Sequence, residues 1–313
     1  MTIASSTSQR SQISPTFSDL GSTSVSEADD DSLPNVSHQP RTIRAIGESW
    51  TIARIGDGSS PLIIHVPHSG TWIPESERSE IQLDDGELAV ELARMTDWFT
   101  DRMAFDALAR ADAAAAVFVN QASRLLIDPE RFLGEDEPML SVGMGPVYGA
   151  TSDRGLLRKP DPVRDDLLIH KYFRPYAAAF TDLVDQTLAA NGRADIIDLH
   201  SFPSRALPYE LDATADRPCI CIGTDPLHTP PELESAAIEA FTSGTWDVGT
   251  NSPFAGTYVP LKHLGRVRNV RSVMIEVRRD LYQFEPGGSL HSGFERVVDH
   301  LAHLFGRLAR SGT

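Results

Sequence analysis

The chain has 313 residues, of which 41% are hydrophobic, so it is long enough to build the core of one large α/β domain. Its net charge of −16, with no block rich in Lys and Arg, argues against nucleic acid or an anionic membrane as a partner. The sequence shows neither an apolar run long enough for a membrane span nor a signal peptide, and its two cysteines, Cys219 and Cys221, fit a reducing compartment. We therefore expect a cytoplasmic protein.

The first residues differ in composition from the rest of the chain. Residues 1–41 are rich in Ser, Thr, Asp and Pro and lack apolar periodicity, which predicts a disordered tail. We expect a single α/β domain over residues 42–313. The predicted elements in chain order are strands at Trp50–Ile55 and Pro61–Val66, a helix over 84–110, short strands at Ala113–Asn120 and Arg124–Asp128, an irregular loop over 134–160, a helix over 162–190 bent at Pro175, strands at 195–199 and 218–222, a helix over 231–242, a strand at 272–278 and a helix from about 289.

Strands that alternate with helices predict a mostly parallel sheet covered by helices on both faces. Two strand-like runs in this pattern end in histidine. One is followed by Pro67 and His68, and the other contains Asp198 and ends at His200. Because parallel strands deliver side chains to the crevice beyond their carboxyl ends, the two histidines are candidate ligands of one metal ion. His65, three residues before His68, is the competing ligand, and a histidine that only caps a strand is the alternative.

Two carboxylates lie inside apolar strands. Asp198 shares a strand face with His200 and can accept a hydrogen bond from it, or it can bond backbone amides instead. Glu276 lies between Ile275 and Val277, where a partly desolvated carboxylate is suited to act as a general base. Its alternative is an internal salt bridge to Arg271 or Arg278. Together with the histidines, these residues predict a zinc-type hydrolase.

The residues alone leave two assignments open. Candidates for the third metal ligand are Glu75, Asp97 and Asp101, and helical periodicity disfavours Asp97 unless the helix breaks near Thr96. Arg124 and Arg131 lie near predicted strand ends. They can bind a substrate carboxylate or a developing oxyanion, or they can pair with the neighbouring acidic residues on the surface.

The order of these motifs resembles the N-formylglutamate amidohydrolase family over about residues 61–283. The motifs that carry the resemblance are Pro67-His68-Ser69-Gly70-Thr71, Thr96-Asp97-Trp98, Ser123-Arg124, Asp128 with Arg131, Arg174-Pro175-Tyr176, Asp198-Leu199-His200-Ser201, Asn251 to Tyr258 and Ile275-Glu276-Val277-Arg278. The resemblance implies a fold similar to the zinc carboxypeptidases, with one Zn²⁺ ion held by His68, Asp97 and His200.

The same resemblance implies the roles of the remaining residues. Glu276 is expected to be the general base, and Arg124 is expected to act in catalysis and in substrate binding. Arg131, Asn251 and Tyr258 are expected to bind the substrate, a small anionic N-acyl amino acid such as N-formylglutamate. Two departures bear on the substrate. Glu130 stands where the family usually has Asn, and Ala177 follows Tyr176 where the family often has His.

Two other functions stay open at this point. A peptidase similar to the zinc carboxypeptidases would act on peptides or cell-wall fragments, and whether the 134–160 loop closes the cleft decides between large and small substrates. A non-catalytic homologue that binds a ligand is the third hypothesis, motivated by Glu130. The sequence does not reveal the oligomeric state.

Overall fold

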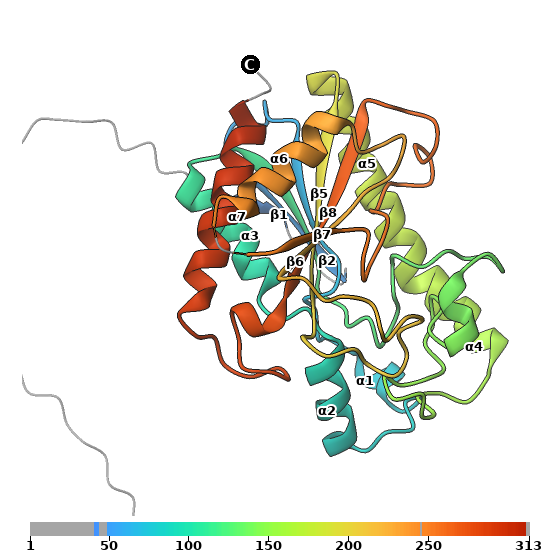
Figure 1. The fold of residues 1–313 in the computed structure, drawn as a ribbon. Helices are drawn as coiled ribbons and strands as arrows, with labels where there is room; N and C mark the ends of the chain where they lie inside the picture. Colours follow the sequence, from blue (N-terminus) through green and yellow to red (C-terminus); the bar gives the residue numbers. More distant parts are fainter. Residues whose placement is uncertain (1–40, 44–48, 245, 311–313) are drawn as a thin grey trace, which may run out of the picture. The chain divides into compact units, whose positions relative to one another are not determined.

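The computed structural model describes residues 41–43, 49–244 and 246–310. Apart from Arg41, the predicted tail lies outside the described residues. Eight strands form one sheet in the order β1-β2-β4-β3-β5-β8-β6-β7 (Figure 1). The strands are β1 (Arg41–Ile43), β2 (Trp50–Ile55), β3 (Leu62–Val66), β4 (Ala115–Asn120), β5 (Ala194–Phe202), β6 (Ile220–Gly223), β7 (Val248–Thr250) and β8 (Val270–Arg278).

The four central strands, β4, β3, β5 and β8, run parallel to one another, and β2 and β6 pair antiparallel with the two sides of this block. Every residue of β3 and β5 is buried, as expected for parallel strands covered on both faces. The expected fold class, a mostly parallel mixed sheet between helices, is therefore confirmed.

Helices cover both faces of the sheet (Figure 1). The helices are α1 (Glu75–Arg78), α2 (Asp85–Met95), α3 (Thr100–Ala111), α4 (Pro162–Leu168), α5 (Arg174–Asn191), α6 (Pro231–Thr242) and α7 (Gly293–Arg310), with short helical turns at Pro138–Val142, Ile169–Phe173 and Arg279–Leu281. Apolar residues of α3, α6 and α7 pack on one face with Ile64 and Ile197. Residues of α5, among them Phe180, pack on the other face with Ile63 and Ile196. This alternation directs His65 and Asp198 toward the α5 face.

The predicted helix over 84–110 is wrong as a single element. It is divided into α2 and α3 by an extended Thr96 and a left-handed Phe99, with φ of 67°. Thr96 ends α2, and the Asp97 backbone carbonyl accepts a hydrogen bond from the Thr100 hydroxyl in the first turn of α3. Apolar periodicity alone could not reveal this break, because α2 and α3 each keep an apolar stripe toward the core.

Three further differences are local. Residues 124–126 form a turn rather than a strand, because the amides of Leu126 and Ile127 donate to the Ser123 carbonyl. The helix over 162–191 contains a π turn at Ile169–Phe173 just before Pro175, whose missing N–H removes one helical hydrogen bond. The short edge strands β1 and β7 were not expected, since three residues give too little alternation.

No helix within the described part of the chain is long and apolar enough to cross a membrane.

Candidate metal centre and active-site cleft

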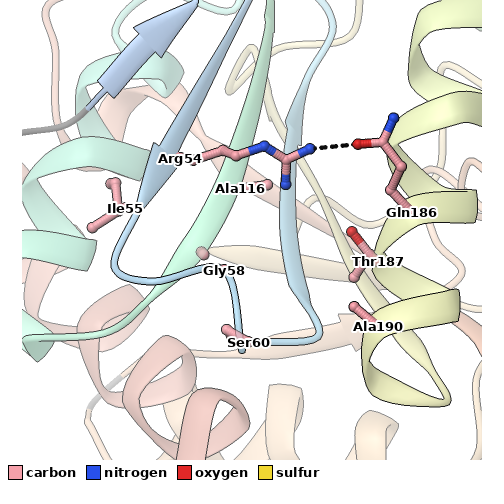
Figure 2. Close-up of a pocket in the computed structure, with 9 residues that line it drawn as sticks. Arg54, Ile55, Gly58, Ser60, Ala116, Gln186, Thr187 and Ala190 are labelled. Atoms are coloured by element: carbon pink, nitrogen blue, oxygen red, sulfur yellow. Dashed lines mark hydrogen bonds between the residues drawn. The ribbon is translucent and has the colours of Figure 1, made fainter.

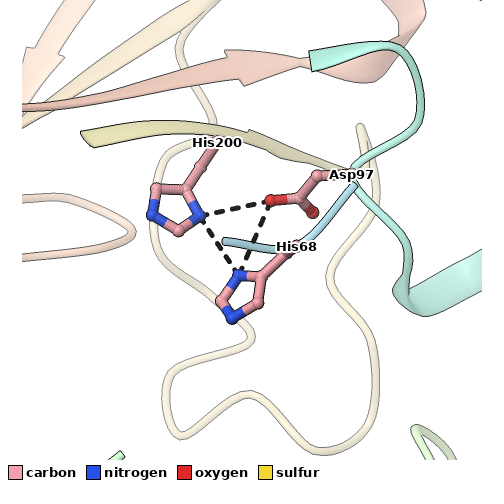
Figure 3. Close-up of side chains that lie close together, drawn as sticks. All are labelled: His68, Asp97 and His200. Carbon is pink, nitrogen blue, oxygen red and sulfur yellow. Dashed lines mark hydrogen bonds and ion pairs between the residues drawn. The ribbon is translucent and has the colours of Figure 1, made fainter. Parts of the chain in front are cut away.

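Three side chains from distant parts of the chain converge beyond the carboxyl ends of β3 and β5. The Nδ1 atoms of His68 and His200 lie 3.2 Å apart, and Asp97 Oδ2 lies 3.2 Å from Nδ1 of His200 and 3.8 Å from Nδ1 of His68 (Figure 3). All three residues are buried. Their donor atoms are close enough to hold one metal ion. The structure thus brings together the three residues expected as ligands.

The local backbone explains how these side chains meet. The chain leaves β3 at Pro67, and the backbone carbonyl of His68 accepts a hydrogen bond from the amide of Asp97 at 3.0 Å. This bond fixes the break between α2 and α3 to the end of β3. His200 is held by the sheet itself, where it lies opposite Glu276 in the pairing of β5 with β8.

The outer nitrogen of each imidazole faces a buried carboxylate. His68 Nε2 lies 2.9 Å from Asp128 Oδ1, and His200 Nε2 lies 3.1 Å from Asp198 Oδ1. A proton on each Nε2 satisfies these carboxylates and leaves the Nδ1 lone pairs directed at the shared point, which is the usual arrangement behind metal-binding histidines. The expected contact between Asp198 and His200 on one strand face is present.

The electrostatics of the cluster favour a cation. Burial and the nearby Arg124 lower the pKa of His68, so this ring favours the neutral form. Burial also opposes a charge on His200, but Glu130 and Asp198 outweigh it and hold the pKa of His200 well above its ordinary value. The carboxylates around the two rings therefore stabilise positive charge at this point.

Arg279, which the sequence analysis missed, positions Asp97. Its Nη2 donates to Asp97 Oδ1 at 2.8 Å and to the Ser201 carbonyl at 3.1 Å. Burial opposes ionisation of Asp97, but the hydrogen bond from His200 and the charge of Arg279 keep the pKa of Asp97 well below its usual range. Strand periodicity could not find this residue, because β8 ends at Arg278 and a helical turn begins at Arg279.

Asp128 links the candidate metal centre to the arginines. It is fully buried and accepts hydrogen bonds from His68, from Arg124 Nη2 at 2.9 Å and from the Tyr148 hydroxyl. Arg131 Nε lies 3.6 Å from the same carboxylate and has no hydrogen-bond partner. The two arginines are therefore not ordinary surface residues.

Glu276 lies beside the cluster with one free oxygen. Only 7% of the residue is exposed, and its Oε2 has no hydrogen-bond partner. Burial raises the pKa of Glu276 to about 8. The alternative of an internal salt bridge is not seen, because Arg278 pairs with Asp280 and Arg271 pairs with Asp195. A carboxyl group in this environment can exchange a proton near neutral pH.

The competing histidine, His65, is engaged elsewhere. Its ring nitrogens lie 2.9 Å from Asp198 Oδ1 and 2.6 Å from the Tyr176 hydroxyl, and its ring stacks on Phe180 at 4.3 Å. His65 and Asp198 also form, with Glu130, a second group of donors within metal-binding distance of one another.

A cavity of about 1070 Å³ opens onto the metal centre. His68, His200 and Glu276 line it, as do Arg124, Arg131 and Tyr258. Asn251 does not line it. The Asn251 side chain instead hydrogen-bonds Thr224 from a left-handed backbone with φ of 54°, so it shapes its own loop.

A smaller cavity, of about 340 Å³, lies at the opposite strand ends (Figure 2). There Arg54 donates a hydrogen bond to Gln186 at 2.8 Å. None of the grouped His and carboxylate donors of the described residues lines this cavity. The chemistry therefore belongs to the larger cavity.

Imidazoles and carboxylates gather at the ends of the parallel strands of this open α/β sheet. The arrangement defines an α/β enzyme whose active site lies in the crevice at those strand ends. The sequence profile described as N-formylglutamate amidohydrolase matches residues 60–283. The chain belongs to the N-formylglutamate amidohydrolase family, and it is an amidohydrolase by that membership.

Solved structures share the fold. The chain is similar to an N-formylglutamate amidohydrolase from Ralstonia eutropha JMP134, with 24% identity, a TM-score of 0.71, and coverage of 84% of this chain and 98% of that chain. It is also similar to a gene product from Agrobacterium tumefaciens, with 16% identity, a TM-score of 0.60, and coverage of 85% and 96%. A metallo-carboxypeptidase from Burkholderia cenocepacia reaches a TM-score of only 0.37, with 16% identity and coverage of 88% of this chain and 65% of that chain. Among curated proteins, none matches the chain.

Proposed function

We propose that the chain is a zinc-dependent amidohydrolase that cleaves the amide bond of a small N-acyl amino acid. Formyl is the first acyl group to test, because the family name refers to N-formylglutamate. The observation that carries the proposal is the convergence of His68, Asp97 and His200 on one point, where the two histidines and Glu276 line the large cavity.

The donor set fits one zinc ion. Two imidazole nitrogens and one carboxylate oxygen are a common set for catalytic zinc and leave a fourth position for water or substrate. Each imidazole is oriented from behind by a carboxylate, which supports a metal site rather than a chance cluster. A bound zinc ion supplies a Lewis acid that makes water more acidic and polarises the amide carbonyl.

Glu276 is the proposed general base. The Glu276 carboxylate, which lines the cavity, accepts the proton of the attacking water and then delivers it to the nitrogen of the leaving amine. The pKa of about 8 lies close enough to neutral pH for both transfers. The C–N amide bond breaks, and the products are a free amino acid and a small carboxylate such as formate.

The two arginines have distinct proposed tasks. Arg124 is fixed by Asp128 and by the Tyr148 hydroxyl, so its remaining N–H groups are held in place to stabilise the oxyanion. One such donor typically contributes about 3 kcal/mol to transition-state stabilisation. Arg131, which lines the cavity, binds the substrate carboxylate, and Tyr258 forms part of the cavity wall.

The cavity wall favours a small substrate over a peptide. Glu137, Pro138 and Met139, near the start of the irregular loop, line the cavity, as does Phe132 just before it. This loop therefore lies against the cleft rather than aside from it, which favours an amidohydrolase over a peptidase.

The cytoplasmic location stays a prediction, with both cysteines present as free thiols.

Metal analysis coupled to a substrate screen tests the proposal. Purified protein is expected to hold one zinc ion per chain, to lose amine release from N-formyl, N-acetyl or N-succinyl amino acids on chelation, and to regain it with zinc. His200→Ala is expected to lose zinc and activity together. Full zinc occupancy in that variant would show that the proposed ligand set is wrong.

A further inference from the structure

Glu130 lies behind the two histidines of the candidate metal centre. Its Oε2 lies 3.3 Å from His200 Nε2 and 3.7 Å from His68 Nε2, on the outer side of both rings. Its Oε1 is buried and has no hydrogen-bond partner, and the nearest ring nitrogen, His65 Nδ1, is 3.6 Å away. The residue also lines the cavity. No arginine or lysine in the described part of the chain forms an ion pair with it.

The cationic side chains that line the cavity are nearly all used by the protein itself. Five lysines and arginines line it, against nine aspartates and glutamates. Three of the five have a carboxylate of their own: Arg94 pairs with Asp153, Lys262 with Asp185 and Arg279 with Asp97, whereas Arg124 and Arg131 share Asp128.

Only Arg131 supplies a surplus positive charge. It shares Asp128 with Arg124, and its distance from that carboxylate, 3.6 Å, is the longer of the two. One arginine charge therefore remains to bind one substrate carboxylate. A second carboxylate on the substrate would find no free cation among the residues that line the cavity, and it would meet the added charge of Glu130.

We infer that Glu130 determines the charge of the substrate, so that the enzyme takes an N-acyl amino acid with a single negative charge and an uncharged or cationic side chain, and disfavours a dicarboxylate. This inference rests on the proposed function for its reaction, but it concerns only which amino acid is bound. An uncharged residue at position 130 would leave the site one charge more positive and would remove the discrimination.

The sharpest test compares N-formyl-L-glutamine with N-formyl-L-glutamate. The two compounds have nearly the same shape and differ by one negative charge. In zinc-loaded wild-type protein, kcat/KM for the glutamine derivative is expected to exceed that for the glutamate derivative by at least about tenfold. Glu130→Gln is expected to reduce this ratio by about tenfold, whereas Glu130→Asp, which keeps the charge, is expected to retain most of it.

The ratio is chosen because it does not depend on how much protein is active. Glu130 faces the back of His200, so Glu130→Gln can also change the zinc content, but both substrates then report on the same loaded fraction. Glu135→Gln is the matched control, since Glu135 is exposed in the same loop and does not line the cavity. It is expected to leave the ratio unchanged.

A binding measurement separates the failure of this inference from the failure of the proposed function. Calorimetric titration gives the Kd of each compound for the Glu276→Gln variant and for the double variant that also carries Glu130→Gln. The ratio of the two Kd values in each variant makes the same comparison as the kcat/KM ratio. If wild-type protein hydrolyses neither compound but the Kd ratio shifts as expected, the proposed reaction is wrong and the charge selection stands. Equal or tighter binding of the glutamate derivative, or a ratio that Glu130→Gln does not move, would overturn the inference.

Discussion

Replacing Asp128 by Asn tests whether the metal centre depends on the carboxylate behind His68. Asp128 is fully buried and accepts hydrogen bonds from His68, Arg124 and Tyr148. Asn has almost the same size but carries no charge, and its amide group turns one acceptor oxygen into a donor. Asp128→Asn therefore removes the charge while it leaves little empty space.

Two measurable effects follow from these contacts. Breaking a buried ion pair by removing one partner costs about 3–5 kcal/mol, so the free energy of unfolding of the metal-free protein is expected to fall by about that amount. Loss of the carboxylate behind a ligand histidine typically weakens metal binding about 10–100-fold, which corresponds to about 1.4–2.7 kcal/mol. The second effect adds to the first when zinc is present.

Zinc competition with a chromophoric chelator measures the affinity, and urea unfolding with and without zinc measures both stabilities. Asp153→Asn is the control, because this aspartate is 58% exposed and lies 3.5 Å from Arg94 in a surface pair. It is expected to change stability by less than about 1 kcal/mol and to leave zinc affinity unchanged. Wild-type zinc affinity in Asp128→Asn would refute the role given to Asp128.

Three further predictions concern other parts of the molecule. Glu276→Gln is expected to lower kcat about 10²–10⁴-fold while zinc content, measured by metal analysis, stays at one ion; a smaller loss would reject Glu276 as the base. Phe180→Ala, in the core beneath His65, is expected to lower the free energy of unfolding by about 3–5 kcal/mol in urea titration, whereas the 63% exposed Phe284 is expected to tolerate Ala within about 0.5 kcal/mol. Comparable losses in the two variants would contradict the described core. Deletion of residues 1–40 is expected to leave kcat/KM nearly unchanged in a steady-state assay, and a large loss would contradict the interpretation of this segment as a tail without a catalytic role.

The two histidines at the candidate metal centre could be predicted because their positions depend on strand periodicity and on the common edge of parallel strands. Asp97 could not be placed by periodicity. It reaches the centre only because Phe99 adopts a left-handed backbone and the Asp97 amide binds the carbonyl of His68, and both features depend on contacts far apart in the sequence. The resemblance to a family supplied that residue instead.

Asp198, behind His200, was expected from strand alternation, but two other residues that support the proposed ligands were the hardest to predict. Asp128 lies in a segment that was mistaken for a strand, and Arg279 begins a helical turn after β8. Neither follows a repeating pattern, since each is positioned by the packing of loops from different parts of the chain. The sequence indicated that Glu130 would affect the substrate, but it did not show that this carboxylate lies behind His200.

The position of β8 has a consequence for how the molecule is synthesised. β8 is the last strand of the sheet in chain order, yet it lies between β5 and β6 and is the strand through which β6 and β7 join the parallel block. Until the ribosome has released residues 270–278, β5 presents an unpaired edge, and β6 and β7 have no partner strand to extend. A nascent or prematurely terminated chain therefore has two open sheet edges and lacks Glu276. We expect chaperones to bind such a chain or proteases to degrade it, and we do not expect it to act as an enzyme of reduced activity.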